Sequence, residues 1–76
     1  MLTEELLSYV LDIGEQMLVN GAEVNRVEDS IIRICKSYRA KRVDVFTITS
    51  SIVVTLQRED GSSITQTRRI HKYSST

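Results

Sequence analysis

Apolar residues recur at intervals of three and four along two stretches of the chain, which is the spacing of one buried face of an α-helix. The first predicted helix runs from about residue 3 to residue 20, and the second from about residue 23 to residue 38. Their apolar positions are Leu6, Leu7, Val10, Leu11, Ile13, Met17 and Leu18 in the first helix, and Val24, Val27, Ile31, Ile34, Cys35 and Tyr38 in the second. Each helix is therefore expected to bury one side in a shared core.

A short break at Asn20-Gly21 separates the two helices. Glycine takes positive φ without a steric penalty, so Gly21 is expected to end the first helix. A break this short folds the second helix back along the first. Gly14 lies inside the first helix, where glycine costs about 1 kcal/mol relative to alanine. We expect it to allow a close approach of the second helix.

The pattern changes from helical spacing to alternation after a basic connector at residues 39–42, and alternation is typical of β-strands. In the first predicted strand, one side carries Val43, Val45, Thr47 and Thr49, and the other carries Asp44, Phe46 and Ile48. Residues 52–57 and 63–70 are predicted to form two further strands. Turns are expected at residues 49–51 and 58–61.

The second turn, Arg58-Glu59-Asp60-Gly61, is the clearest hairpin signal in the chain. A two-residue Asp60-Gly61 loop places Leu56 opposite a threonine. A three-residue loop with Gly61 left-handed places Leu56 opposite Ile64, so that two apolar residues share a face. Because a one-residue slip reverses the faces, we predict the three-residue loop.

The predicted fold is α+β, with two antiparallel helices packed on one face of a small three-stranded antiparallel sheet, in the order ααβββ. A chain of 76 residues is expected to form one soluble domain, 1–76. Neither helical stretch has the uninterrupted apolar length of a membrane span, since the first carries four acidic residues.

Charge is divided unevenly along the chain, although the net charge is zero. Residues 1–29 hold seven acids and one base, and residues 30–76 hold nine bases and three acids. Two interpretations follow: acidic and basic elements pack beside each other, or a basic surface formed by Arg39, Lys41, Arg42 and Arg69 binds an anionic partner.

The sequence offers few groups for catalysis. One cysteine, Cys35, and one histidine, His71, do not form a transition-metal cluster, and the chain lacks a phosphate-binding loop. No adjacent base activates any of the serines. We therefore predict no metal, no cofactor and no enzymatic activity.

Four residues are the best candidates for contact with a ligand or partner: Asn25, Arg26, Glu28 and Arg68. Glu28 suits the positive N-terminal end of the second helix, whereas Arg26 at the same end does not. Arg26 is therefore expected to pair with an acid of the first helix or with an anionic group outside the domain.

Several segments, in this order and spacing, resemble the N-terminal hydrophilic domain of the threonine/serine exporter family. They are Gly21-Ala22, Arg26-Val27-Glu28, the run from Val43 to Ile52, the Gly61 hairpin and Thr67-Arg68-Arg69-Ile70. The resemblance covers about residues 11–70. One departure is Arg39, which stands where family members often have a glycine in a left-handed helix cap.

The resemblance implies that this chain is a fragment of a membrane protein that exports threonine, serine or small dicarboxylates. Family members carry such a domain, on the cytoplasmic side, ahead of several membrane spans. The implied role is regulation or assembly, and the implied partners are the membrane domain of the same protein, a companion subunit, a second copy or an anionic membrane surface. The polar third strand is a candidate for pairing with another chain.

Two other classes of function stay open at the sequence level. A small nucleic-acid-binding domain would use Arg39, Lys41, Arg42, Arg68, Arg69 and Lys72 on phosphates, but it lacks paired aromatics and net positive charge. A hydrolase remnant would depend on Arg26 and Glu28. A gel shift at low salt tests the first, and turnover of generic esters or peptides tests the second.

Overall fold

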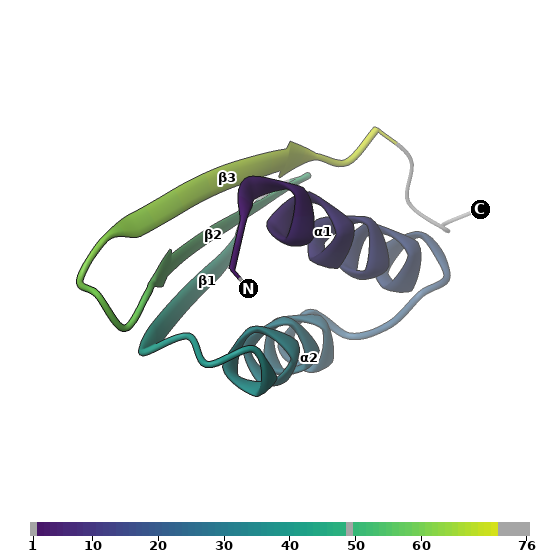
Figure 1. Ribbon diagram of the computed structural model, residues 1–76. Helices are drawn as coiled ribbons and strands as arrows, with labels where there is room; N and C mark the ends of the chain where they lie inside the picture. Colours follow the sequence, from purple (N-terminus) through teal and green to yellow (C-terminus); the bar gives the residue numbers. More distant parts are fainter. Residues whose placement is uncertain (1, 49, 72–76) are drawn as a thin grey trace.

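The computed structural model describes residues 2–48 and 50–71. Two helices, α1 (Glu4–Val19) and α2 (Val24–Ser37), precede three strands, β1 (Arg42–Ile48), β2 (Ser51–Gln57) and β3 (Ser63–Arg69). Both helices lie on the same face of the sheet, with α1 beside β3 and α2 beside β1 (Figure 1). The predicted ααβββ order and α+β class are confirmed, and the helix ends fall within one residue of their predicted positions.

The ends of α1 follow directly from local sequence. Thr3 is the N-cap, and its side-chain oxygen accepts a hydrogen bond from the Leu6 N–H at 3.1 Å. At the other end Gly21 takes a φ of 92°, and the N–H groups of Gly21 and Ala22 donate to the carbonyls of Leu18 and Met17. These two bonds form a Schellman cap, which ends the helix at the predicted glycine.

Helix α2 ends with the same cap, although no glycine is present. Arg39 takes a left-handed φ of 71°, and the N–H groups of Arg39 and Ala40 donate to the carbonyls of Lys36 and Cys35. The departure from the family pattern thus leaves the backbone geometry of the cap unchanged. Because arginine has a Cβ, this left-handed conformation has a steric cost that glycine would avoid.

The strands form an antiparallel sheet in the order β1-β2-β3. Leu56 lies opposite Ile64, as the three-residue loop requires, and the Arg58 N–H donates to the Ser62 carbonyl across the base of that loop at 2.7 Å. Gly61 has a φ of 93°. The predicted hairpin register is confirmed. Of the predicted first turn, Ser50 takes a φ of 57°, and Thr49 lies outside the described residues.

The core fills the space between the helices and the covered face of the sheet. Its fully buried side chains are Leu7, Val10, Leu11, Val27, Ile31, Cys35, Ile52, Val54 and Leu56. Gly14 is buried where α1 meets α2, and a Cβ added there would lie 3.0 Å from the Ile31 δ-methyl carbon. The expected role of this glycine in close helix packing is confirmed.

The predicted apolar stripes extend farther than the buried surface. Ile13 is 40% exposed, because it lies on the side of α1 that faces away from the sheet. Val24 and Tyr38 are also exposed, since they stand at the two ends of α2, beyond the part of the helix that the core covers. The prediction that these three residues are buried is therefore wrong.

Candidate functional site

Arg68 is the centre of the main polar cluster between sheet and helix. It lies on the covered face of β3, in the row that joins Thr47, Ile52 and Arg68 across the three strands. Its guanidinium Nη1 lies 2.6 Å from Asp12 Oδ1 and 2.9 Å from Glu15 Oε1, both on α1. Its Nη2 donates more weakly to the carbonyl and hydroxyl of Ser8, at 3.3 and 3.4 Å.

This environment favours the charged form of Arg68 and occupies both terminal nitrogens of its guanidinium group. The hydrogen bond to Asp12 is the largest effect that raises the pKa of the guanidinium above its usual range, Glu15 adds to it, and partial burial opposes it. The side chain is 22% exposed. Arg68 is therefore a cation that holds β3 to α1, which supports the interpretation that acidic and basic elements pack beside each other.

Glu28 also makes a contact within the molecule. Its Oε2 accepts a hydrogen bond from the backbone N–H of Thr47 at 2.9 Å. Thr47 lies on β1, and no strand lies beside the outer edge of β1 among the described residues, so the carboxylate satisfies a donor that this sheet leaves unpaired. The same contact joins α2 to the far end of β1. Beside it, the side-chain oxygen of Thr47 is buried and has no hydrogen-bond partner within residues 2–48 and 50–71.

Asn25 and Arg26 are exposed on the first turn of α2. Within residues 2–48 and 50–71, the Arg26 side chain forms no hydrogen bond or ion pair. The expected internal pairing of Arg26 with an acid of α1 is thus absent from the described part of the chain. The structure separates the four candidates into two contacts that hold the fold together, at Glu28 and Arg68, and two exposed residues.

The four residues predicted to form a basic surface lie at opposite ends of the sheet. Arg39, Lys41 and Arg42 are at or beside the start of β1, and Arg42 pairs with Asp44 at 3.3 Å. Arg69 stands in the row of Ile48 and Ser51, six residues farther along the strands, or about 20 Å at 3.3 Å per residue. Since Arg68 faces α1, the described basic side chains do not form one continuous surface, and Lys72 lies outside the described residues.

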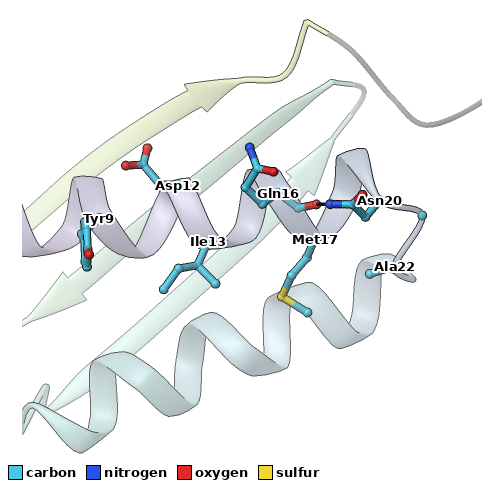
Figure 2. Close-up of a pocket in the computed structure, with 8 residues that line it drawn as sticks. Tyr9, Asp12, Ile13, Gln16, Met17, Asn20 and Ala22 are labelled. Carbon is cyan, nitrogen blue, oxygen red and sulfur yellow. Dashed lines mark hydrogen bonds between the residues drawn. The ribbon is translucent and has the colours of Figure 1, made fainter.

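A shallow groove of about 670 Å³ runs along α1. It is lined by Tyr9, Asp12, Ile13, Gln16, Met17, Asn20, Gly21 and Ala22. Figure 2 shows Ile13 and Met17 directed toward the side of α1 on which α2 lies, and Asp12 and Gln16 directed toward the strands. The apolar periodicity did not predict this groove, because it placed Ile13 on the buried face; Met17 does pack against the core. Ile13 is 40% exposed, whereas the periodicity predicted that it is buried.

A second apolar surface lies on the face of the sheet opposite the helices. Phe46 and Ile48 are 63% and 61% exposed, and Val53 pairs directly with Phe46. The alternation of the sequence placed Phe46 and Ile48 on one side of their strand. It did not show that this side lies away from the helices.

The described residues contain no group of three or more histidine, cysteine or acidic side chains that is able to hold a metal ion. Cys35 is buried, and this burial raises the pKa of its thiol, which disfavours the reactive thiolate. None of the helices in the described part of the chain has the length and apolar character needed to cross a bilayer.

Fold and polar contacts together define a small two-layer α+β domain whose internal ionic groups hold the layers together. Sequence comparison then gives its family. The chain belongs to the family described as "ThrE: Putative threonine/serine exporter", whose profile matches residues 8–76. This description is that of a transporter. No curated protein and no solved structure matches the chain.

Proposed function

We propose that this chain is a soluble module of a membrane exporter of threonine, serine or a small dicarboxylate, and that it acts in assembly or regulation rather than in chemistry. Membership of the exporter family supports the proposal that the chain is part of a membrane exporter. The use of Glu28 and Arg68 in internal contacts supports a role without catalysis. In this proposal the module stands on the cytoplasmic side and meets the membrane domain or another subunit.

The free edge of β3 is the observation that carries the assembly role. The Arg58 N–H donates to the Ser62 carbonyl, and the Ile70 N–H donates to the Ser50 carbonyl. In an antiparallel ladder the residues that bond to the neighbour alternate with residues that face outward. The backbone groups of Ser63, Thr65, Thr67 and Arg69 therefore face the open edge.

This edge suits pairing with a strand from another chain. β3 is seven residues long, and no strand covers its outer side in the described part of the chain. An uncovered edge of this length is a template for strand addition. The β1 edge is less suitable, because Glu28 already occupies the outward N–H of Thr47.

Light scattering across a concentration series tests this role with a second copy of the chain as partner. The expected result is a mass that rises from monomer toward dimer. Thr67→Pro removes one outward N–H without removing a bond between β2 and β3, so it should keep the fold and suppress the dimer.

Glu59→Pro is the matched control, because the second position of this turn accepts proline. It should leave the dimer unchanged. A chain that stays monomeric at every concentration, or a Thr67→Pro variant that dimerises as well as the unaltered chain, contradicts self-assembly through β3.

A further inference from the structure

The outer face of the sheet is divided into a polar half and an apolar half. Near the start of β1 it carries the Arg42–Asp44 ion pair and a hydrogen bond of 2.9 Å between the hydroxyl groups of Thr55 and Thr65. Toward the other end it carries Phe46, Ile48 and Val53, which we call the outer apolar patch. Thr67 borders the patch on β3, opposite Val53.

The outer apolar patch contributes little to the core. Phe46 and Ile48 lie on the face opposite the helices, and each exposes more than half of its surface. Single exposed apolar residues are common on protein surfaces. Here two large ones stand two positions apart on the same face of one strand, and Val53 of the next strand adjoins them. Such a contiguous group is typical of a contact surface.

An exposed arginine borders this patch. Arg69 stands in the same row as Ile48 and Ser51 on the outer face of the sheet. Asp44, the acidic residue on the outer face of β1, pairs with Arg42 rather than with Arg69. The patch therefore combines exposed apolar side chains with an arginine that forms no ion pair within the described part of the chain.

We propose that the outer apolar patch rests on the surface of an anionic phospholipid bilayer, with Phe46 and Ile48 inserted among the lipids and Arg69 beside the headgroup phosphates. Apolar side chains next to a basic residue are the combination that drives interfacial binding, and each basic residue near an anionic leaflet adds to the attraction. The membership of the chain in an exporter family supports a setting near a bilayer.

A second copy of the chain is a poorer occupant of this surface. A stable protein interface buries about 800 Å² on each partner, and three apolar residues fall well short of that. The proposal for the patch is independent of strand pairing at β3, so either is able to fail alone.

Co-sedimentation of the chain with phospholipid vesicles tests this inference. Vesicles containing phosphatidylglycerol should bind the chain at low salt, and vesicles of phosphatidylcholine alone should bind it at least about fivefold more weakly. Phe46→Trp supplies a probe, and its emission should shift to shorter wavelength on binding because the ring enters an apolar layer.

Paired variants separate insertion from charge attraction. Phe46→Ser with Ile48→Ser should weaken binding about tenfold or more at every salt concentration. Arg69→Gln should weaken it about fivefold at low salt and less at high salt, where ionic attraction is screened. Tyr9→Ser, which removes a 68% exposed aromatic from α1, is the matched control and should bind normally.

Three results overturn the inference. They are absence of binding to anionic vesicles at low salt, equal binding by the double serine variant, and an equal loss in the Tyr9→Ser control. Circular dichroism of each variant shows whether the fold is kept. The unaltered chain could instead form a dimer and fail to bind vesicles. If a patch variant then abolishes the dimer in light scattering, the patch binds a protein partner.

Discussion

Among single residues, Arg39 combines a regular helix cap with an unfavourable side chain. Its φ of 71° lies in the left-handed region, where residues other than glycine are disfavoured by about 1–2 kcal/mol. Arg39→Gly should relieve this strain. Because glycine also gains freedom in the unfolded chain, the net increase in unfolding free energy should be smaller, about 0.5–1 kcal/mol.

Urea unfolding measures this change, and Lys36→Gly is the matched control. Lys36 is exposed inside α2, so the same substitution there should lower the unfolding free energy by about 1 kcal/mol. If both glycine variants are destabilised alike, Arg39 is not strained in the folded chain.

Gly14 illustrates the opposite constraint, in which space rather than backbone conformation selects the residue. A Cβ at this position would lie 3.0 Å from Ile31 Cδ1 and 3.4 Å from Ile52 Cδ1. Gly14→Val should lower the unfolding free energy by about 1–3 kcal/mol through overpacking. That loss corresponds to a decrease in Tm of at least about 4 °C for a domain of this size.

Gly14→Ala provides the comparison for this prediction. It adds one methyl group, which the end of the Ile31 side chain is able to avoid, and it gains about 1 kcal/mol of helix propensity. Its unfolding free energy should therefore stay close to that of the unaltered chain. A valine variant as stable as the alanine variant would show that the helices separate freely at this contact.

Among the elements, the β2–β3 hairpin has a turn whose stability depends on pH. The carboxylate of Asp60 accepts hydrogen bonds from the hydroxyl and the backbone N–H of Ser62, at 2.7 and 2.9 Å. The hydroxyl contact is the main cause that lowers the pKa of Asp60 below its usual value. The stabilisation that Asp60 gives the turn is therefore present above its unfolded pKa and lost as the pH falls through the folded value.

An NMR titration of the Asp60 carboxyl group checks this prediction. Ser62→Ala should raise the pKa of Asp60 toward its usual value, because it removes the hydroxyl donor and keeps the backbone donor. Ser63→Ala, one residue later, should leave that pKa unchanged. An unaltered Asp60 titration in the Ser62→Ala variant contradicts the assigned cause.

Local patterns were sufficient to predict each helix and strand. Thr3 and Gly21 are short-range signals that set the ends of α1, and the match of Leu56 with Ile64 selected the hairpin loop. Periodicity alone did not show which apolar residues of each helix are buried by the neighbouring layer. It gave the same interpretation to Ile31, which is fully buried, and to Ile13, which faces the groove, because coverage depends on the neighbouring layer.

The candidate site was less predictable, because its contacts join distant parts of the chain. Arg68 was predicted to contact a ligand or partner, whereas its contacts within the chain are with residues more than fifty positions earlier, on α1. Glu28 was also a predicted contact residue. It accepts a hydrogen bond from the Thr47 N–H, which is available because β1 stands at the edge of the described sheet. Contacts between residues so far apart in the sequence depend on the packing of the two layers, which local patterns do not show.

For the whole molecule, the division of charge along the chain has a structural consequence at Arg68. The acidic first part and the basic last part meet where Arg68 contacts Asp12 and Glu15, so this contact fastens the free-edged strand to α1. Arg68→Ala should lower the unfolding free energy by about 1–2 kcal/mol, since it removes partly buried charged hydrogen bonds.

Arg33→Ala is the matched control for this prediction. Arg33 forms an ion pair with Asp29 at 3.3 Å, but its side chain is 80% exposed, so solvent screens the attraction. Its removal should change the unfolding free energy by less than about 0.5 kcal/mol. Hydrogen exchange adds a local measure. In Arg68→Ala the inward-facing amides of β3 should lose more protection than those of β1, because the contacts that Arg68 makes join β3, not β1, to α1. If the two variants prove equally stable, Arg68 is a surface charge, and it becomes a candidate for an external partner again.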